Sequence, residues 1–208
     1  AISIADEPSN ASSKGFSLKQ MASLVNKSKL SEPHNQVPSL LKAAHLNNPK
    51  DSQWLDELDI ALINHGYGVN RQRIQHIRNH DVDVWLYNMS NKRLAAGFFL
   101  WKHKLSGYLQ WHARMPTADP YDPTDGREAD YQFFYPQPRS CMALPDVDKG
   151  LFELAMGQYE LRWYLWLDQQ SSPQAEQLRQ SIEKTLGESW LQAAKVDTLQ
   201  LDHWRSQI

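Results

Sequence analysis

The sequence predicts an α/β fold, namely the C-terminal half of a (β/α)8 TIM-type barrel followed by C-terminal helices. Three observations support this prediction. Short apolar runs alternate with helical patterns along most of the chain, which implies right-handed crossovers and a parallel sheet. The glycine-rich turn of dinucleotide-binding folds is absent, which favours a barrel. About five strands can be counted, fewer than a closed barrel of this type needs.

The predicted strands are short runs that are rich in apolar or β-branched residues. They cover residues 2–7, 40–46, 58–63, 82–88 and 107–114. The first run ends at Pro8, which lacks an N–H group and biases Glu7 toward an extended backbone. The second run also fits a helical turn.

The predicted helices are marked by caps and by apolar spacing. One begins at Ser17, which can form a capping box with Gln20, and another covers about 70–80. Apolar residues at spacings of four, three and four mark a third, and these are Leu94, Phe98, Trp101 and Leu105. Asp148 caps a fourth helix.

The tail of the chain continues as helix. Pro173 starts a segment that Gly187 closes. We therefore expect two regions, with residues 1–170 forming the C-terminal part of the barrel and residues 171–208 forming a helical extension packed on it. The chain starts without methionine and enters a strand at once, so we expect a fragment whose partner is the missing N-terminal half of the barrel, or a second copy through self-association.

Composition narrows the function. Lys and Arg number 22 against 24 Asp and Glu, a net charge of −2 without a basic cluster, so we expect no nucleic-acid partner. No apolar run is long enough to cross a membrane, and no membrane partner is expected. The 8 Trp, 8 Tyr and 6 Phe are numerous, and many fall in loops where a sugar ring could stack.

The residues that follow the predicted strands suggest a site. Parallel strands share one edge for their C-terminal ends, so polar and aromatic residues should converge there. They are Asp6, Glu7, His65, Tyr67, Tyr87, Asn88, Trp111 and His112. Glycosidases need a general acid, a stabilising partner and flat walls for a pyranose ring. Repulsion between Asp6 and Glu7 would let one of them keep its proton. The plainer alternative is that both are solvated loop acids before a turn.

An ordered series of motifs resembles the catalytic domain of glycoside hydrolase family 123 and its uncharacterised relatives. The series consists of Asp6-Glu7-Pro8, Trp85-Leu86-Tyr87-Asn88, Gly97-Phe98-Phe99-Leu100-Trp101, Gln110-Trp111, Asp119-Pro120-Tyr121-Asp122, Asp130 and Tyr135-Pro136. The resemblance runs from the first residues to about Leu167. It implies a retaining glycosidase that acts on terminal N-acetyl-β-hexosaminides, either N-acetylgalactosamine or N-acetylglucosamine, with the 2-acetamido group of the sugar as nucleophile.

The resemblance also implies residue roles. Asp6 would orient the acetamido N–H, and Glu7 would act as general acid and base. Tyr67 or Tyr87 would hold the acetamido carbonyl. Trp101 or Trp111 would lie under the sugar, although the helical position of Trp101 favours a place in the core. The remaining substrate-binding candidates are His65, Asn88 and Asp119.

Other classes of function fit less well. The acids at 119, 122 and 125 recur at every third residue rather than at every second as in a calcium loop, so no metal or cofactor is expected. Cys141 has no specific partner, and the serine-hydrolase elbow is absent. Two alternatives stay open, a non-catalytic carbohydrate-binding barrel and an inactive fragment of a larger glycosidase. The sequence assigns no compartment, although a full-length glycosidase of this kind is expected to be secreted, periplasmic or attached to the surface.

Overall fold

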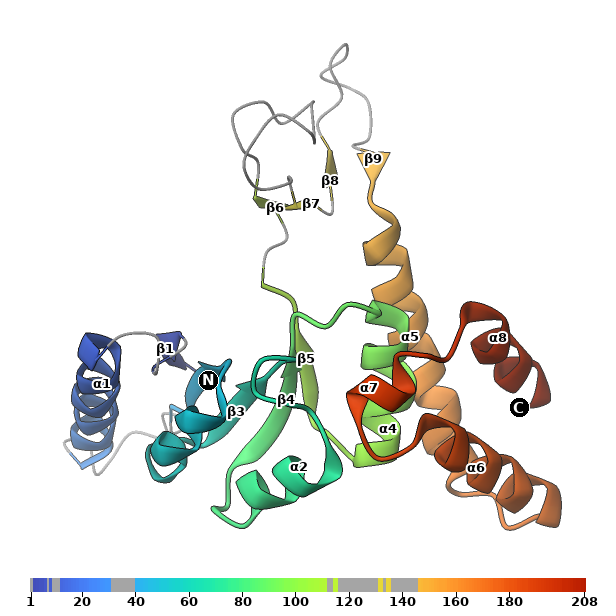
Figure 1. Cartoon of the computed structure of the whole chain (residues 1–208), viewed down its shortest axis with the longest axis horizontal. Helices are drawn as coiled ribbons and strands as arrows, with labels where there is room; N and C mark the ends of the chain where they lie inside the picture. Colours follow the sequence, from blue (N-terminus) through green and yellow to red (C-terminus); the bar gives the residue numbers. More distant parts are fainter. Residues whose placement is uncertain are drawn as a thin grey trace.

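The computed structural model describes residues 2–6, 8, 12–30, 40–111, 114–115, 131–132, 134–135 and 146–208. Its centre is a parallel sheet in which each strand pairs with the next one in the sequence (Figure 1). The five strands are β1(Ile2–Asp6), β2(Lys42–Leu46), β3(Ile60–Ile63), β4(Asp83–Tyr87) and β5(Gly107–Leu109). The prediction of an α/β fold with a parallel sheet is therefore confirmed, and so is the choice of strand over helix for the run at 40–46.

Both faces of the sheet carry apolar side chains, as is usual for parallel strands. The face toward the helices belongs to the main core, and its members include Ala44, Leu46, Ala61, Ile63, Val84 and Leu86. A second, smaller cluster on the alternate positions contains Ala43, Ile60, Leu62 and Tyr87, with Trp85 and Leu109 packed against it. The period of two along each strand produces this division.

Helices connect the successive strands. They are α1(Ser12–Leu30), the 3-10 helix η2(Pro49–Glu57), α2(Arg71–Arg78) and a continuous segment of α3(Lys92–Leu94), the π-helical turn η3(Ala95–Phe99) and α4(Leu100–His103). The predicted helices at 70–80 and around 94–105 are confirmed within a few residues. The start predicted at Ser17 is wrong, because the helix already begins at Ser12. The sequence analysis did not predict η2, which Asn48 and Asp51 begin with a capping box.

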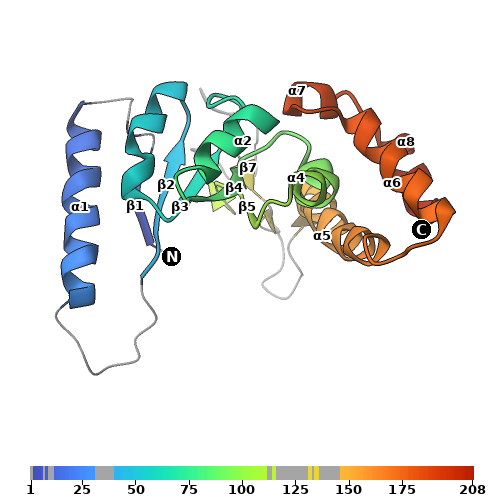
Figure 2. The ribbon, with the colours of Figure 1, turned by 90° about the horizontal axis from the view of Figure 1, so that it is seen from below.

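After β5 the chain forms two short antiparallel pairs and then four helices. The pairs are β6(Arg114–Met115) with β7(Tyr131–Gln132) and β8(Phe134–Tyr135) with β9(Asp146–Val147). The helices are α5(Lys149–Leu167), α6(Pro173–Leu186), α7(Trp190–Ala193) and α8(Thr198–Gln207). Figure 2 shows α6 and α8 outside α5, away from the sheet. Asp148 caps α5 as predicted, and Gly187 ends α6 with a φ of 64° that favours glycine.

Helix α5 crosses the helical segment before β5 at very short range. A Cβ atom on Gly157 would lie 2.5 Å from the carbonyl oxygen of Arg93, and one on Gly97 would lie 3.0 Å from that of Gly157. The two glycines therefore let the backbones touch. Beside this crossing, Arg93 donates hydrogen bonds to Glu160 of α5, with Nε 3.0 Å from Oε2, and to Oδ1 of Asp202 of α8 at 2.7 Å.

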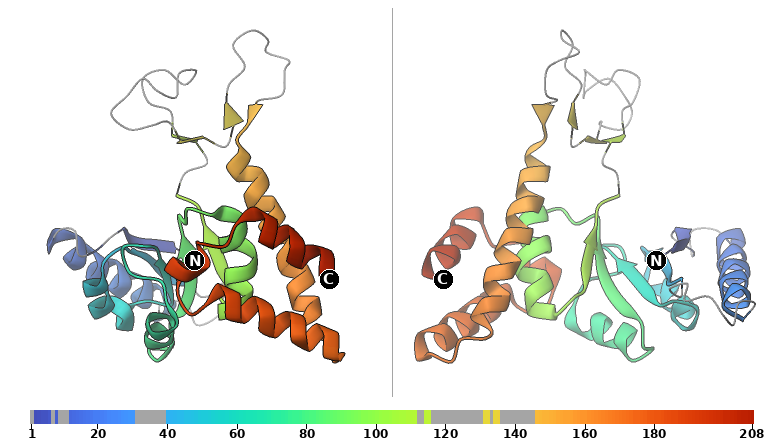
Figure 3. Two further views of the ribbon diagram at one scale, coloured as in Figure 1. Left: turned by 45° about the vertical axis from the view of Figure 1, so that its right-hand side comes forward. Right: turned by 180° about the vertical axis from the view of Figure 1, so that it is seen from behind.

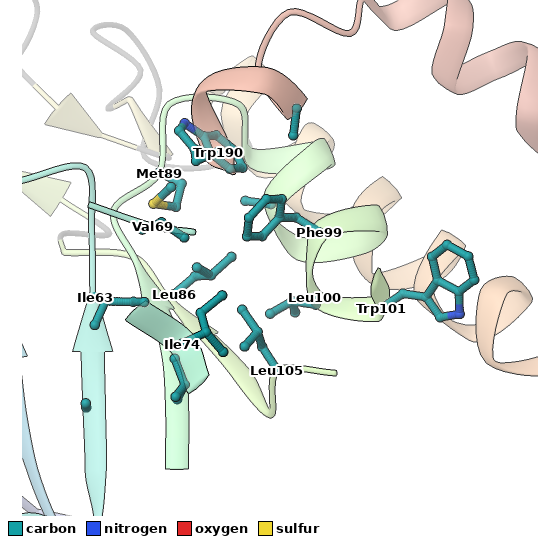
Figure 4. Packing of buried hydrophobic residues seen from close by; sticks show 14 of the residues in the cluster. Ile63, Val69, Ile74, Leu86, Met89, Phe99, Leu100, Trp101, Leu105 and Trp190 are labelled. Carbon is teal, nitrogen blue, oxygen red and sulfur yellow. The ribbon is translucent and has the colours of Figure 1, made fainter. Parts of the chain in front are cut away.

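The main core joins the sheet to the C-terminal helices. Figure 4 shows Ile63 and Leu86 of the sheet turned toward Leu100, Phe99 and Trp190. Residues of α6, α7 and α8 complete the same cluster, and they are Ala175, Ile182, Leu186, Trp190, Ala193, Leu201 and Trp204. Residues 171–208 are thus packed on the α/β part through a shared core.

Candidate functional site

The C-terminal ends of the parallel strands form one edge of the sheet. The register pairs the Cα atom of Asp6 on β1 with that of His45 on β2, and the Cα atom of Tyr87 on β4 with that of Leu109 on β5. The antiparallel pairs β6–β7 and β8–β9 lie beyond this edge in Figure 1. In parallel α/β enzymes, this edge is where ligands bind.

A stacked pair of rings lies at this edge. The imidazole of His45 and the phenol ring of Tyr87 have centroids 4.3 Å apart and planes inclined by 17°. Tyr87 is buried with the smaller apolar cluster, while His45 is half-buried. The sequence analysis selected Tyr87 and missed His45. The available signal was the position of His45, as a polar residue near the end of the apolar run at 40–46.

At the ends of β4 and β5, three side chains form a hydrogen-bonded chain. The amide of Gln110 donates to Oδ1 of Asn88, and the hydroxyl of Tyr108 donates to Oε1 of Gln110 at 2.6 Å. Asn88 has a φ of 49°, a left-handed conformation that asparagine tolerates better than most residues. Its own N–H group donates to the carbonyl of Leu109 at 2.9 Å. This arrangement fixes Asn88 across the ends of β4 and β5.

Trp111 follows Gln110 directly and exposes half of its side chain. Large apolar rings of this kind are normally more buried, and an exposed indole beside fixed amide groups can stack on a flat ligand. The structure therefore brings three predicted site residues, Tyr87, Asn88 and Trp111, to the edge where β4 and β5 end.

Two predicted substrate-binding residues lie away from this edge. Tyr67 is fully buried in the main core, and its hydroxyl lies 2.8 Å from Oγ of Ser52. Burial raises the pKa of Tyr67, and the Ser52 hydrogen bond only partly offsets that effect. The ring of His65 lies 6.0 Å from that of Trp190 on α7, where partial desolvation lowers its pKa. Neither side chain belongs to the group formed by His45, Tyr87 and Asn88.

The predicted carboxylate pair is described in part. The backbone of Asp6 forms the end of β1, in register with His45. Glu7 lies outside the described residues, as do His112 and Asp119. The backbone of Asp6 thus lies at the edge that the C-terminal ends of the five parallel strands form.

The described residues contain no group of three or more His, Cys, Asp or Glu that could hold a metal ion. No helix in this part of the chain is long and apolar enough to cross a membrane. In a comparison with known proteins, no protein-family model and no curated protein matched the chain.

Proposed function

We propose that the chain forms the C-terminal part of a (β/α)8-barrel glycoside hydrolase that acts on terminal N-acetyl-β-hexosaminides. Two features of the fold support the barrel. First, each strand pairs with its neighbour in the sequence, which is the strand order of such barrels. Second, β1 and β5 are the outer strands of the sheet, and these are the two strands that the other half of a barrel would pair with. An open groove of about 360 Å³ runs beside β5, between Tyr108 and the side chains of Leu154 and Leu161 on α5.

One observation supports the site most directly. Asp6 ends β1 in register with His45, whose ring stacks on that of Tyr87, so the start of the Asp-Glu-Pro motif lies one strand from an aromatic pair. Asn88 and Trp111 add amide groups and an exposed indole at the ends of β4 and β5. A carboxylate pair beside such groups is what a pyranose-cleaving site requires.

The reaction follows from the resemblance to family 123. The acetamido carbonyl oxygen of the substrate attacks the anomeric carbon while the glycosidic C–O bond breaks, and Glu7 gives its proton to the leaving oxygen. Asp6 accepts a hydrogen bond from the acetamido N–H group, which becomes acidic as the oxazoline forms. Glu7 then takes a proton from water as the water oxygen attacks the same carbon and the bond from that carbon to the acetamido oxygen breaks, so the configuration is retained.

The structure refines which side chains suit the remaining roles. Tyr67 lies in the main core with its hydroxyl on Ser52, whereas Tyr87 is the last residue of β4, so Tyr87 is the better candidate for holding the acetamido carbonyl. Trp111 would lie against the apolar face of the sugar, and Asn88 would bind a hydroxyl group. His65 and Asp119 stay candidates from the resemblance alone.

The test is release of nitrophenol from aryl N-acetyl-β-galactosaminide and N-acetyl-β-glucosaminide. We expect release by the longest natural form of the protein, and a loss of roughly 100-fold or more when Glu7→Gln or Asp6→Asn is introduced into that form. Glu57→Gln, in η2, is a matched control that should keep the wild-type rate. No release by the wild type, or undiminished release by both variants, would contradict the proposal.

A second function, sugar binding without hydrolysis, is favoured by the exposed indole of Trp111 beside the Asn88–Gln110 hydrogen bond. A titration with N-acetylglucosamine, followed by indole fluorescence, separates the two functions. A pure binding protein would respond equally in wild type and Glu7→Gln, would lose the response in Trp111→Ala, and would release no nitrophenol.

A further inference from the structure

Helix α5 presents a row of large apolar side chains to solvent. We call this row the aromatic face, and it consists of Phe152, Met156, Tyr159, Trp163 and Trp166. Phe152 is 60% exposed, Tyr159 54%, Trp163 40% and Trp166 44%. The right-hand view of Figure 3 shows α5 along the back of the molecule, and α6 and α8 adjoin it at its C-terminal end, where Trp166 lines a hollow with their residues. Continuous exposed patches of this kind usually mark an interaction surface.

The opposite side of α5 is held firmly in place. Gly157 touches the backbone at Arg93, Glu160 is bonded to the Arg93 guanidinium, and Tyr164 packs on Phe98 with ring centroids 4.1 Å apart. The aromatic face therefore cannot turn inward without breaking a buried ion pair and a close helix crossing. It is a rigid surface with a fixed orientation.

The spacing within the aromatic face identifies the geometry of its partner. Successive members are separated by four, three, four and three residues, which is the heptad spacing of a helix that packs along another helix. Ring contacts make the row continuous, with centroids 6.1 Å apart for Tyr159 and Trp163 and 6.3 Å apart for Trp163 and Trp166. A ligand the size of one sugar would cover only a part of it.

We propose that the aromatic face binds α5 of a second copy of this chain, antiparallel and with Tyr159 at the two-fold axis. The face is self-matching in that arrangement. Phe152 lies opposite Trp166 of the second copy, Met156 lies opposite Trp163, and Tyr159 meets its own equivalent. Such a closed pairing uses the same patch on both copies, as two-fold symmetric dimers do.

The area of the face is sufficient for a dimer. Each half-exposed ring leaves roughly 100 Å² in solvent, and the half-buried Met156 adds to them, so each copy offers roughly 500 Å². Two copies would then bury about 1,000 Å², the lower bound for a specific interface. The centre of the pair would be aromatic and free of charge, with Glu153 and Arg162 at the margins, as interfaces prefer.

Sedimentation equilibrium on the intact chain tests the proposal. We expect twice the chain mass of 24.0 kDa for the wild type. Tyr159→Glu should weaken association by roughly 30-fold or more, because it places a charge at the centre of the interface. Leu199→Glu is the matched control, since Leu199 is 77% exposed on α8 outside the face, and it should associate like the wild type. A wild-type monomer at the highest soluble concentration, or an unchanged dimer in Tyr159→Glu, would overturn the proposal.

Cross-linking tests the antiparallel orientation. In a Cys141→Ser background, Tyr159→Cys should form a disulfide-linked dimer under mild oxidation, because the two sulfur atoms would meet at the two-fold axis. Phe152→Cys and Leu199→Cys should stay unlinked. A disulfide through Phe152→Cys would mean that the helices pair in parallel, and this orientation would then be wrong. All three sites are exposed, and unchanged circular dichroism would show that each variant folds.

Discussion

Arg93 and Glu160 place a pair of opposite charges inside the protein. Burial alone would lower the pKa of Arg93, but its hydrogen bonds to Glu160 and Asp202 outweigh that effect and raise it. Both side chains are buried, while Asp202 is half-exposed. Each charge is tolerated because the other is present, so the pair is more important for specifying how α3, α5 and α8 fit together than for net stability.

Removing one charge of this pair should therefore be costly. We predict that Glu160→Gln lowers the free energy of unfolding by about 3 kcal/mol, because it leaves the buried guanidinium with only Asp202 as a charged partner. Urea denaturation measures this. Glu153→Gln, on the same helix but paired with the exposed side chain of Lys149, should change the free energy by less than about 0.5 kcal/mol. Equal effects of the two substitutions would contradict the assigned role of the pair.

His103 is a buried histidine that is neutral at pH 7. Its ring packs on Phe99 with centroids 4.3 Å apart, and the described structure provides no hydrogen-bond partner for Nε2. Burial, together with the charges of Lys102, Arg78 and Arg71, lowers the pKa of His103 to about 4 against the opposing effect of Glu188. In the unfolded chain the same group titrates near its ordinary value of about 6.5.

This difference makes stability depend on pH. Between pH 6.5 and pH 4 the unfolded chain binds a proton at His103 that the native protein does not, so stability falls as the pH is lowered through that window, by up to about 3 kcal/mol. We predict that His103→Phe removes the loss of stability that protonation of His103 causes. The loss that protonation of the carboxylates causes should stay. Denaturation curves at pH 7, 5.5 and 4.5 for both proteins measure the difference. Parallel pH profiles would show that His103 is not the cause.

At the level of single residues, the sequence indicates which positions follow strands but not where their side chains turn. Asn88 directly follows β4, and Trp111 comes shortly after β5. Both residues lie at the predicted edge. Tyr67 comes after a turn of several residues and folds back to pack on η2. There its hydroxyl group shares a hydrogen bond with the hydroxyl group of Ser52. Because η2 was not predicted, the partner that draws Tyr67 into the core was not visible in the sequence.

The crossing of α5 with the segment from α3 to α4 depends on two glycines. We predict that Gly157→Ala destabilises the protein by about 2 kcal/mol, although alanine gains about 1 kcal/mol in helix propensity, because the new methyl group would lie 2.5 Å from the Arg93 carbonyl oxygen. Thermal unfolding measures the change. Ala155→Gly, on the exposed side of α5, should cost only its propensity of about 1 kcal/mol. A neutral or stabilising Gly157→Ala would mean that the helices separate easily.

Elements with a periodic pattern were predictable, and those defined by long-range contacts were not. The spacing of Leu94, Phe98, Trp101 and Leu105 located the helical segment before β5, yet it carries no signal for the π-helical turn at Ala95–Phe99. That turn lies where α5 presses on Gly97, a contact between segments far apart in the sequence. The apolar pattern of the sequence alone cannot show such contacts.

On the scale of the whole molecule, the C-terminal helices and the sheet share one core. The ring of Trp190 on α7 packs on that of Phe99 with centroids 5.2 Å apart, and the backbone N–H group of Trp190 donates to the Val69 carbonyl at 2.9 Å. We predict that Trp190→Ala lowers the free energy of unfolding by about 3–5 kcal/mol. Fluorescence and circular dichroism should report a single transition, since no boundary divides the core. Leu191→Ala, at the neighbouring exposed position, should be nearly neutral.

The strand order of the sheet could be predicted from the alternation of strands and helices, because consecutive parallel strands with short crossovers become neighbours. Closure into a barrel could not, because it depends on what pairs with the outer edges of β1 and β5. The candidate site could likewise be predicted only in part. The strand ends lie at the predicted edge, and Glu7 lies outside the described residues.

The bond between Arg93 and Asp202 also has a consequence for synthesis. The two residues are 109 positions apart, so Arg93 leaves the ribosome roughly 5–20 s before its second carboxylate partner is made. Trp204, whose ring lies 5.0 Å from that of Phe98, arrives later still. Until α8 emerges, the guanidinium of Arg93 is therefore incompletely neutralised and the ring of Phe98 is not covered by Trp204. We expect chaperones to bind the nascent chain mainly during this interval.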